Sequence, residues 1–170
     1  MPISTIGQNG LQQSRILTAV QQPAGAVLQV VQASTTTETT LTSTSYTDTS
    51  LTGTITPTSA TSKILVMVNQ QARLVANSNP SGAGFKLRLL RGSTSISDFG
   101  SGGANTVEIT ADNGGNVRVA GYTAVMYLDS PATTSATTYK TQAAMVSPYN
   151  ASFQGSSTAV STITLMEIAA

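Results

Sequence analysis

Short apolar segments alternate with clusters of turn-forming residues along most of the chain. Beyond residue 25, stretches rich in Val, Ile, Leu and Thr are separated by Gly, Pro, Asn, Asp and Ser at spacings typical of β-sandwiches. These stretches predict strands at residues 27–32, 36–41, 45–48, 51–56, 63–71, 85–91, 107–111, 117–128, 137–146 and 160–168. Because no convincing helical pattern follows residue 25, we predict an all-β fold, an antiparallel, jelly-roll-like β-sandwich.

The segment at residues 85–91 shows the alternation of a half-exposed strand most clearly. Phe85, Leu87 and Leu89 fall on one face of this strand, and the residues between them fall on the other. Successive side chains of a strand point to opposite faces of its sheet. We therefore expect Phe85, Leu87 and Leu89 to face the core.

Two of the predicted strands are instead apolar at consecutive positions, in residues 64–68 and 124–128. Both faces of such a strand need cover, whereas a sandwich normally leaves one face of each sheet exposed to water. An amino-terminal arm, a long loop or a neighbouring copy can provide this cover, and the low charge content favours the neighbour. We predict a homo-oligomer, as a trimer, although the pattern supports association and not the number three. The predicted packing positions are Leu65, Met67, Val125 and Tyr127.

A turn signal lies between the predicted strands at residues 107–111 and 117–128. It consists of Asp112, Asn113, Gly114 and Gly115, residue types that tolerate positive φ, and it predicts a hairpin turn. With Asn116 these residues also resemble a calcium-binding loop. However, they lack the alternating oxygen ligands and the closing glutamate of that motif, so the hairpin is the preferred interpretation.

Residues 1–25 differ in composition from the rest of the chain. They are rich in glutamine and are interrupted by glycine and proline. Ile16, Leu17 and Val20 are spaced to form one apolar face of a helix. We interpret residues 1–25 as an extended or partly helical anchoring arm, with an unstructured leader as the alternative, and residues 26–170 as the β-sandwich domain.

The composition suits one domain with an aliphatic core. The chain has 170 residues, of which 39% are hydrophobic but only 5% are aromatic and 9% are charged. The net charge of +1 comes from scattered side chains, so no basic stripe is available for nucleic acid. The apolar runs are far shorter than a membrane-spanning helix, and the first residues do not resemble a secretory signal. We therefore expect no nucleic-acid or membrane partner and no direct export.

The side chains used most often in catalysis are missing. Histidine and cysteine are absent, which removes the usual general base, the commonest metal ligand and the Ser-His and Cys-His nucleophile arrangements. A glycosidase pair of carboxylates can still assemble in space, but such sites lie in grooves lined by aromatic residues, and tryptophan is absent. We expect a protein that is not an enzyme and that has no cofactor and no metal site. The acidic residues show no paired spacing: Glu38, Asp48, Asp98, Glu108, Asp112, Asp129 and Glu167.

Four stretches carry a family likeness. They are GAVLQVVQASTTTETTLTSTSYTDTSLTGTITPTSATSKILVMVNQQ at residues 25–71, LLRGST at residues 89–94, LDSPATTSATTYKTQ at residues 128–142 and STITLMEIAA at residues 161–170. Together they resemble a family of small virion proteins of tailed bacteriophages. The resemblance implies a β-sandwich module, commonly trimeric and without catalytic residues, that serves as a capsid decoration, a head fibre or a tail-fibre component. Residues 1–25 depart from the family, so attachment to a particular virion partner is expected there.

These observations predict a structural protein of the virion that assembles in the host cytoplasm. The preferred function is a trimeric capsid decoration protein, of the cement or head-fibre kind, attached by its arm to the major capsid protein or to adjacent copies. The alternative is a short tail fibre or receptor-binding module, which would bind tail proteins and contact host glycans through loops at residues 75–84 and 96–105. An enzyme that degrades host polysaccharide is a third, less favoured hypothesis, because Trp and His are absent.

Overall fold

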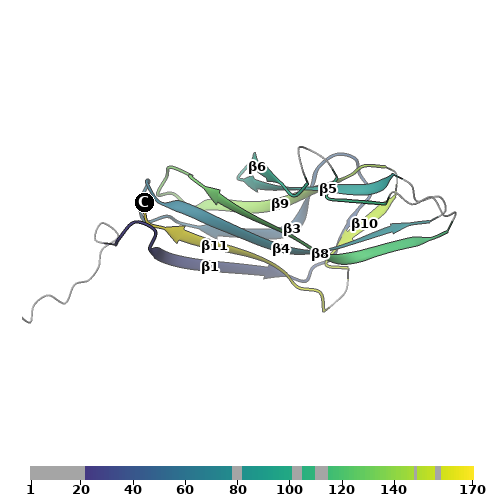
Figure 1. The fold of residues 1–170 in the computed structure, drawn as a ribbon, viewed down its shortest axis with the longest axis horizontal. Helices are drawn as coiled ribbons and strands as arrows, with labels where there is room; N and C mark the ends of the chain where they lie inside the picture. The colour runs from purple at the N-terminus through teal and green to yellow at the C-terminus, as the bar shows by residue number, and fades with distance from the viewer. Residues whose placement is uncertain (1–21, 78–81, 101–104, 110–114, 148, 156–157) are drawn as a thin grey trace, which may run out of the picture.

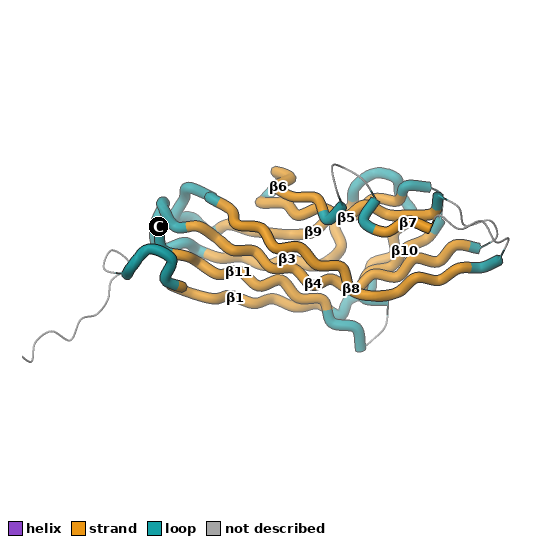
Figure 2. Tube along the Cα trace, in the orientation of Figure 1, coloured by secondary structure: helices purple, strands orange, loops and turns teal. Residues whose placement is uncertain are grey.

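The computed structural model describes residues 22–77, 82–100, 105–109, 115–147, 149–155 and 158–170. These residues form two antiparallel sheets that pack face to face (Figure 1). The first sheet contains β1 (Val27–Thr35), β2 (Thr39–Leu41), β4 (Lys63–Ala76), β8 (Val117–Asp129), β10 (Asn150–Phe153) and β11 (Ser161–Ile168). The second contains β3 (Thr47–Ile55), β5 (Ala83–Arg91), β6 (Thr94–Asp98), β7 (Val107–Ile109) and β9 (Thr137–Met145). In Figure 2 the longer strands of both layers run along the long axis of the molecule.

Strand pairing follows a nested order along the chain. β1 pairs with β11, β3 with β9, β4 with β8, and β5 with β6. The main strands are therefore arranged as β1-β11-β4-β8 in the first sheet and β3-β9-β5-β6 in the second. This is the arrangement of a jelly roll, in which eight strands form two Greek keys. The predicted fold class is confirmed, with β2, β7 and β10 as short additional strands.

Alternate residues of the two sheets meet between the layers in two clusters. The cluster nearer the carboxyl terminus contains Leu51, Ile55, Ile64, Val66, Val68, Leu89, Tyr139, Ile163 and Leu165. In the distal cluster, the rings of Phe85 and Phe153 meet edge to face with centroids 5.4 Å apart. Phe85, Leu87 and Leu89 are all buried, so the prediction that they face the core is confirmed.

The sequence pattern missed two strands and misplaced some boundaries. β6 and β10 are short and contain small polar residues, so pairing with β5 and β4 rather than an apolar alternation identifies them. Residues 45–48 are not a strand of their own, because β3 begins at Thr47. β4 continues to Ala76, beyond the predicted end at residue 71.

The hairpin predicted at Asp112, Asn113, Gly114 and Gly115 needs a correction. The flanking strands do not pair with each other: β7 pairs with β5 in the second sheet, and β8 pairs with β4 in the first. The connection therefore crosses between sheets. Gly115 is exposed, whereas residues 112–114 lie outside the described residues. Turn-forming residues mark a break between strands, but they do not specify which strand the chain pairs with next.

A buried carboxylate joins the two sheets at the end of β8. Asp129 accepts hydrogen bonds from Arg91 Nη1 at 2.9 Å to each carboxylate oxygen and from the Tyr139 hydroxyl at 2.7 Å. Burial, and then the hydrogen bond to Asp129, raise the pKa of Tyr139 above its ordinary value. The hydroxyl therefore keeps its proton and remains a donor to the carboxylate.

Replacing Tyr139 with Phe should destabilise the fold by about 1–3 kcal/mol, because Asp129 loses a donor in a buried site. Urea denaturation of Tyr139→Phe against the natural chain measures this loss. Tyr122→Phe is the matched control, because Tyr122 is 56% exposed, and its effect should stay within about 0.5 kcal/mol. Equal stability of Tyr139→Phe and the natural chain would show that the hydroxyl does not help to hold the sheets together.

Candidate functional site

The outer face of the first sheet carries an exposed apolar patch. One cross-strand row runs over four strands, with Val30 opposite Met166, Met166 opposite Leu65, and Leu65 opposite Leu128. Met67 and Met126 face each other in the next apolar pair. We call these six residues the outer apolar patch.

The side chains of the patch are open to solvent. Met126 is 74% exposed, Val30 is 55% exposed and Leu128 is 50% exposed. Leu65, Met67 and Met166 are half-buried, because their neighbours within the sheet cover part of each side chain. Contiguous apolar surface of this kind marks interaction sites in proteins that are otherwise soluble.

The patch is confined to one half of the sheet. A further row across the same four strands consists of Ser34, Thr162, Asn69 and Ala124, which are polar or small. The apolar half is the one nearest the ends of β11 and β8, where the chain also enters β1. An interaction surface here therefore lies at the end of the sheet where the described part of the chain begins, at Gln22.

The structure separates the four predicted packing positions into two pairs. Leu65 and Met67 lie on the outer face and belong to the patch. Val125 and Tyr127 instead point between the sheets, where they pack against the core cluster. Their apolar character is thus explained within one chain. The assignment of Val125 and Tyr127 to subunit contacts is corrected for this reason, whereas the role of Leu65 and Met67 stays a prediction.

Within a single chain, only the inner faces of residues 64–68 and 124–128 are covered, so burial of their second face by a neighbouring copy stays a prediction. Their inner side chains are buried or half-buried, but Ala124, Met126 and Leu128 are exposed on the outer face. Among the described residues, no segment covers these three side chains. The apolar run identified an unsatisfied face correctly but did not show what covers it.

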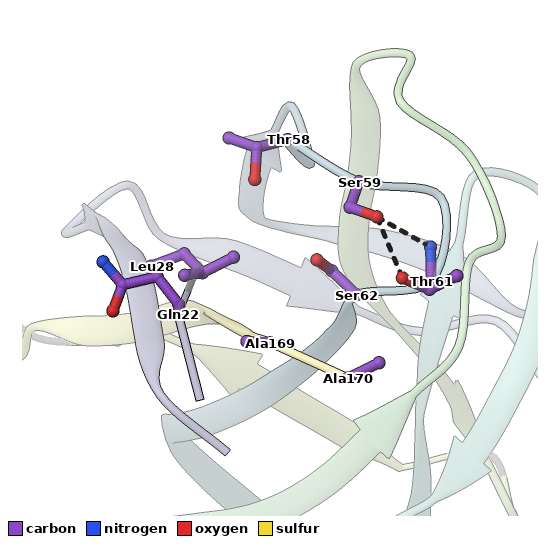
Figure 3. Close-up of a pocket in the computed structure, with 8 residues that line it drawn as sticks. All are labelled: Gln22, Leu28, Thr58, Ser59, Thr61, Ser62, Ala169 and Ala170. Carbon is purple, nitrogen blue, oxygen red and sulfur yellow. Dashed lines mark hydrogen bonds between the residues drawn. The ribbon is translucent and has the colours of Figure 1, made fainter. Parts of the chain in front are cut away.

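A cavity of about 340 Å³ lies at the base of the arm (Figure 3). Gln22 and Leu28 line one side, and residues of the connection between β3 and β4 line the other. In that connection, the Ser59 hydroxyl accepts a hydrogen bond from the Thr61 backbone amide at 3.2 Å. Gly25 and Ala26 exchange backbone hydrogen bonds with Ala169, at 2.8 and 2.9 Å. The base of the arm is therefore fixed to the carboxyl-terminal end of β11.

Glu167 is a second buried carboxylate, located near this cavity. It accepts hydrogen bonds from Gln29 Nε2 at 2.6 Å and from the backbone amide and the hydroxyl of Thr58, each at 2.8 Å. Burial alone would raise the pKa of Glu167, but these hydrogen bonds outweigh it and hold the pKa below its ordinary value. The carboxylate therefore stays ionised and ties the connection after β3 to β1 and β11.

The acidic residues do not assemble into a metal site within the described part of the chain, where no group of three or more potential ligands is found. Asp129 and Glu167 are each engaged by structural donors. Asp48 lies near the surface and accepts from Lys140 Nζ at 2.9 Å and Gln142 Nε2 at 2.8 Å. The hydrogen bond from Lys140 is the main cause that lowers the pKa of Asp48.

The sequence was compared with protein-family models and with curated proteins. No protein-family model matches the sequence, and no curated protein matches it significantly. No described helix is long and apolar enough to cross a membrane.

The arm positions Ile16, Leu17 and Val20 lie outside the described residues. Of the six patch residues, only Leu65 and Met67 were predicted from the sequence. Met126 and Leu128 lie in an apolar run that was recognised, but they were not named as packing positions. Val30 and Met166 were missed, because only the register places them beside Leu65.

Replacing Glu167 with Gln should destabilise the fold by about 1–3 kcal/mol at pH 7. The NH₂ group of the new side chain cannot accept a hydrogen bond, so one of the donors on Gln29 or Thr58 loses its acceptor. A carboxyl group with a lowered pKa contributes stability above its ordinary value of 4.5 and loses it as the pH falls. The difference between the natural chain and Glu167→Gln should therefore shrink below about pH 4.5. Urea denaturation from pH 7 to pH 3 measures this trend, with exposed Asp98→Asn as the control. A difference that stays constant down to pH 3 would contradict the assignment.

Proposed function

We propose that the protein is a non-enzymatic structural protein of a bacteriophage virion, a trimeric capsid decoration protein of the cement or head-fibre kind. The outer apolar patch is the observation that carries this proposal. Exposing Met126, Val30 and Leu128 together is unfavourable for an isolated subunit, at roughly 25 cal/mol for each Å² of apolar surface left in water. Burial of the patch between copies or against a shell removes this cost.

The jelly-roll fold and the sequence resemblance support the proposal in different ways. Jelly rolls occur in viral capsid proteins, but also in lectins and cupins, so the fold alone does not assign a function. The resemblance of residues 25–71 and 161–170 to phage virion proteins is the reason for proposing a phage virion as the assembly to which the protein belongs. The described base of the arm, residues 22–25, lies at the same end of the first sheet as the patch, which supports attachment and subunit contact at that end.

If copies associate through the patch, the protein should sediment at three times the monomer mass of 17.4 kDa at micromolar concentration. Met126→Lys should raise the dissociation constant at least about tenfold, or about 1.4 kcal/mol, because it places a charge in the buried contact. Its high exposure leaves the monomer fold intact. Thr94→Lys, on an exposed position of the second sheet, is the charge-matched control and should have no effect. A natural chain that remains a stable monomer would refute the homo-oligomer.

Deleting residues 1–22 should abolish incorporation into phage particles while the sandwich stays folded, since the deletion ends before β1. Immunoblots of purified particles measure incorporation, and circular dichroism verifies the fold. Normal incorporation of the truncated chain would contradict the anchoring role. The copy number of the natural chain distinguishes two locations: hundreds of copies fit the capsid, whereas a few dozen or fewer fit a tail fibre.

A further inference from the structure

β8 is a long strand with one unpaired edge. It extends over 13 residues and pairs along its length with β4, and no other strand of the described residues pairs with it. Natural edge strands are usually short, or carry lysine or proline that discourages further pairing. β8 contains neither residue, and its only charges are Arg118 and Asp129. Its free edge therefore offers backbone donors and acceptors to an additional strand.

An apolar groove opens beside this edge, between the sheets. Its volume is about 140 Å³, and its lining includes Ala72, Phe85, Val107, Val119 and Gly121. Val119 is 41% exposed, although the register places it on the core-facing side of β8. A Cβ atom built on Gly121 would have no atom within 4 Å. The groove is therefore an unfilled part of the core that is accessible from the free edge.

The arm has the sequence of a strand that fits this groove. Ile16, Thr18 and Val20 are β-branched and lie two residues apart, so in an extended chain they share one face. Leu17 and Ala19 share the other face. An added strand at a sheet edge gains affinity from backbone hydrogen bonds and specificity from alternate side chains that enter pockets. Ile16 and Val20 are of a size and polarity that suit the groove.

The geometry excludes residues 16–20 of the same chain. Gln22 lies at the cavity beside Ser62, just before β4 begins, whereas the groove reaches β4 at Ala72. Ala72 lies nine positions after Lys63 in the same strand, which corresponds to a distance of about 30 Å. Residue 16 is six residues from Gln22 and can reach at most about 21 Å from it. An arm segment that places Ile16 and Val20 in the groove must therefore come from another copy.

We propose that residues 15–20 of one copy add as a strand to the free edge of β8 in a neighbouring copy. Side chains of Ile16 and Val20 then fill the neighbour's groove, and Ala19 faces outward beside Ala120, Tyr122 and Ala124. This inference rests on the proposed homo-oligomer and names a second contact between its copies, besides the outer apolar patch. Residues 1–14 remain available for the virion shell.

The chain contains no cysteine, so engineered pairs give an unambiguous disulfide test. Ala19→Cys is combined in turn with Ala120→Cys, Tyr122→Cys or Ala124→Cys in the full-length protein, and each is oxidised. We expect covalent dimers and trimers on a non-reducing gel for at least one pair, in a yield at least fivefold above the control. That control combines Ala19→Cys with Ser95→Cys, an exposed position in the second sheet.

Gly121→Val, added to the cross-linking protein, tests the groove itself. Valine fills the open space without a clash in the monomer, so the fold should persist while cross-linking falls at least fivefold. Ala124→Val in the Ala120→Cys background adds bulk to the outer face of the same strand and should leave cross-linking unchanged. Circular dichroism verifies the fold of both.

The possible failures are distinguishable. A protein that sediments as a monomer refutes the proposed oligomer and this inference together. An intact trimer that forms no covalent dimer with any of the three pairs overturns the strand addition alone, and assigns the groove to another occupant such as a capsid segment. Cross-linking only within the monomer overturns the exchange between copies. Cross-linking that survives Gly121→Val overturns the insertion into the groove.

Discussion

The register of β4 with its neighbours determines which side chains reach the core and which face outward. β4 pairs with β8 on one edge and with β11 and then β10 on the other. Ile64, Val66 and Val68 consequently point between the sheets, while Leu65 and Met67 point away from them. A slip of one residue would exchange the two sets. Because residues 64–68 are apolar at every position, this segment alone discriminates poorly between the two registers.

Polar side chains provide the discrimination that the apolar run lacks. One cross-strand row contains Gln29, Glu167, Ile64 and Asp129, so both buried carboxylates flank the same residue of β4. Asp129 is held by Arg91 and Tyr139 of the second sheet, and Glu167 by Gln29 and Thr58. These contacts fix β8 and β11, the two strands that pair with β4 at this end, and a slip of either would leave a buried carboxylate unpaired, at a cost of several kcal/mol.

Farther along β4, Gln70 makes a similar contribution. Its side-chain amide donates to the Thr49 hydroxyl of the second sheet at 2.7 Å. This contact fixes the register of β4 against the second sheet, whereas the two carboxylates fix its neighbours β8 and β11. A sequence with so few charged residues thus uses two of its seven acids to define its core.

The fold class and most strands followed from the sequence because alternation in a strand is a local property. Phe85, Leu87 and Leu89 show this directly. Pairing is not local: the turn residues at 112–115 predicted a hairpin, whereas β7 and β8 join different sheets. For the same reason, the four residues named from the sequence divide between two faces: Leu65 and Met67 face outward, whereas Val125 and Tyr127 point between the sheets. In a run that is apolar throughout, only the register decides which residues face outward.

The two candidate contacts also constrain how copies assemble. The groove beside β8 and the arm before β1 are different surfaces, so a contact between them is heterologous and joins each copy to a different neighbour. Such contacts either close into a ring or continue as an open filament. In the proposed trimer, a closed ring would use every groove and every arm once. An open filament would leave one groove free at an end, where β8 would remain a site for further pairing. Closure is thus the arrangement that leaves no free edge of β8.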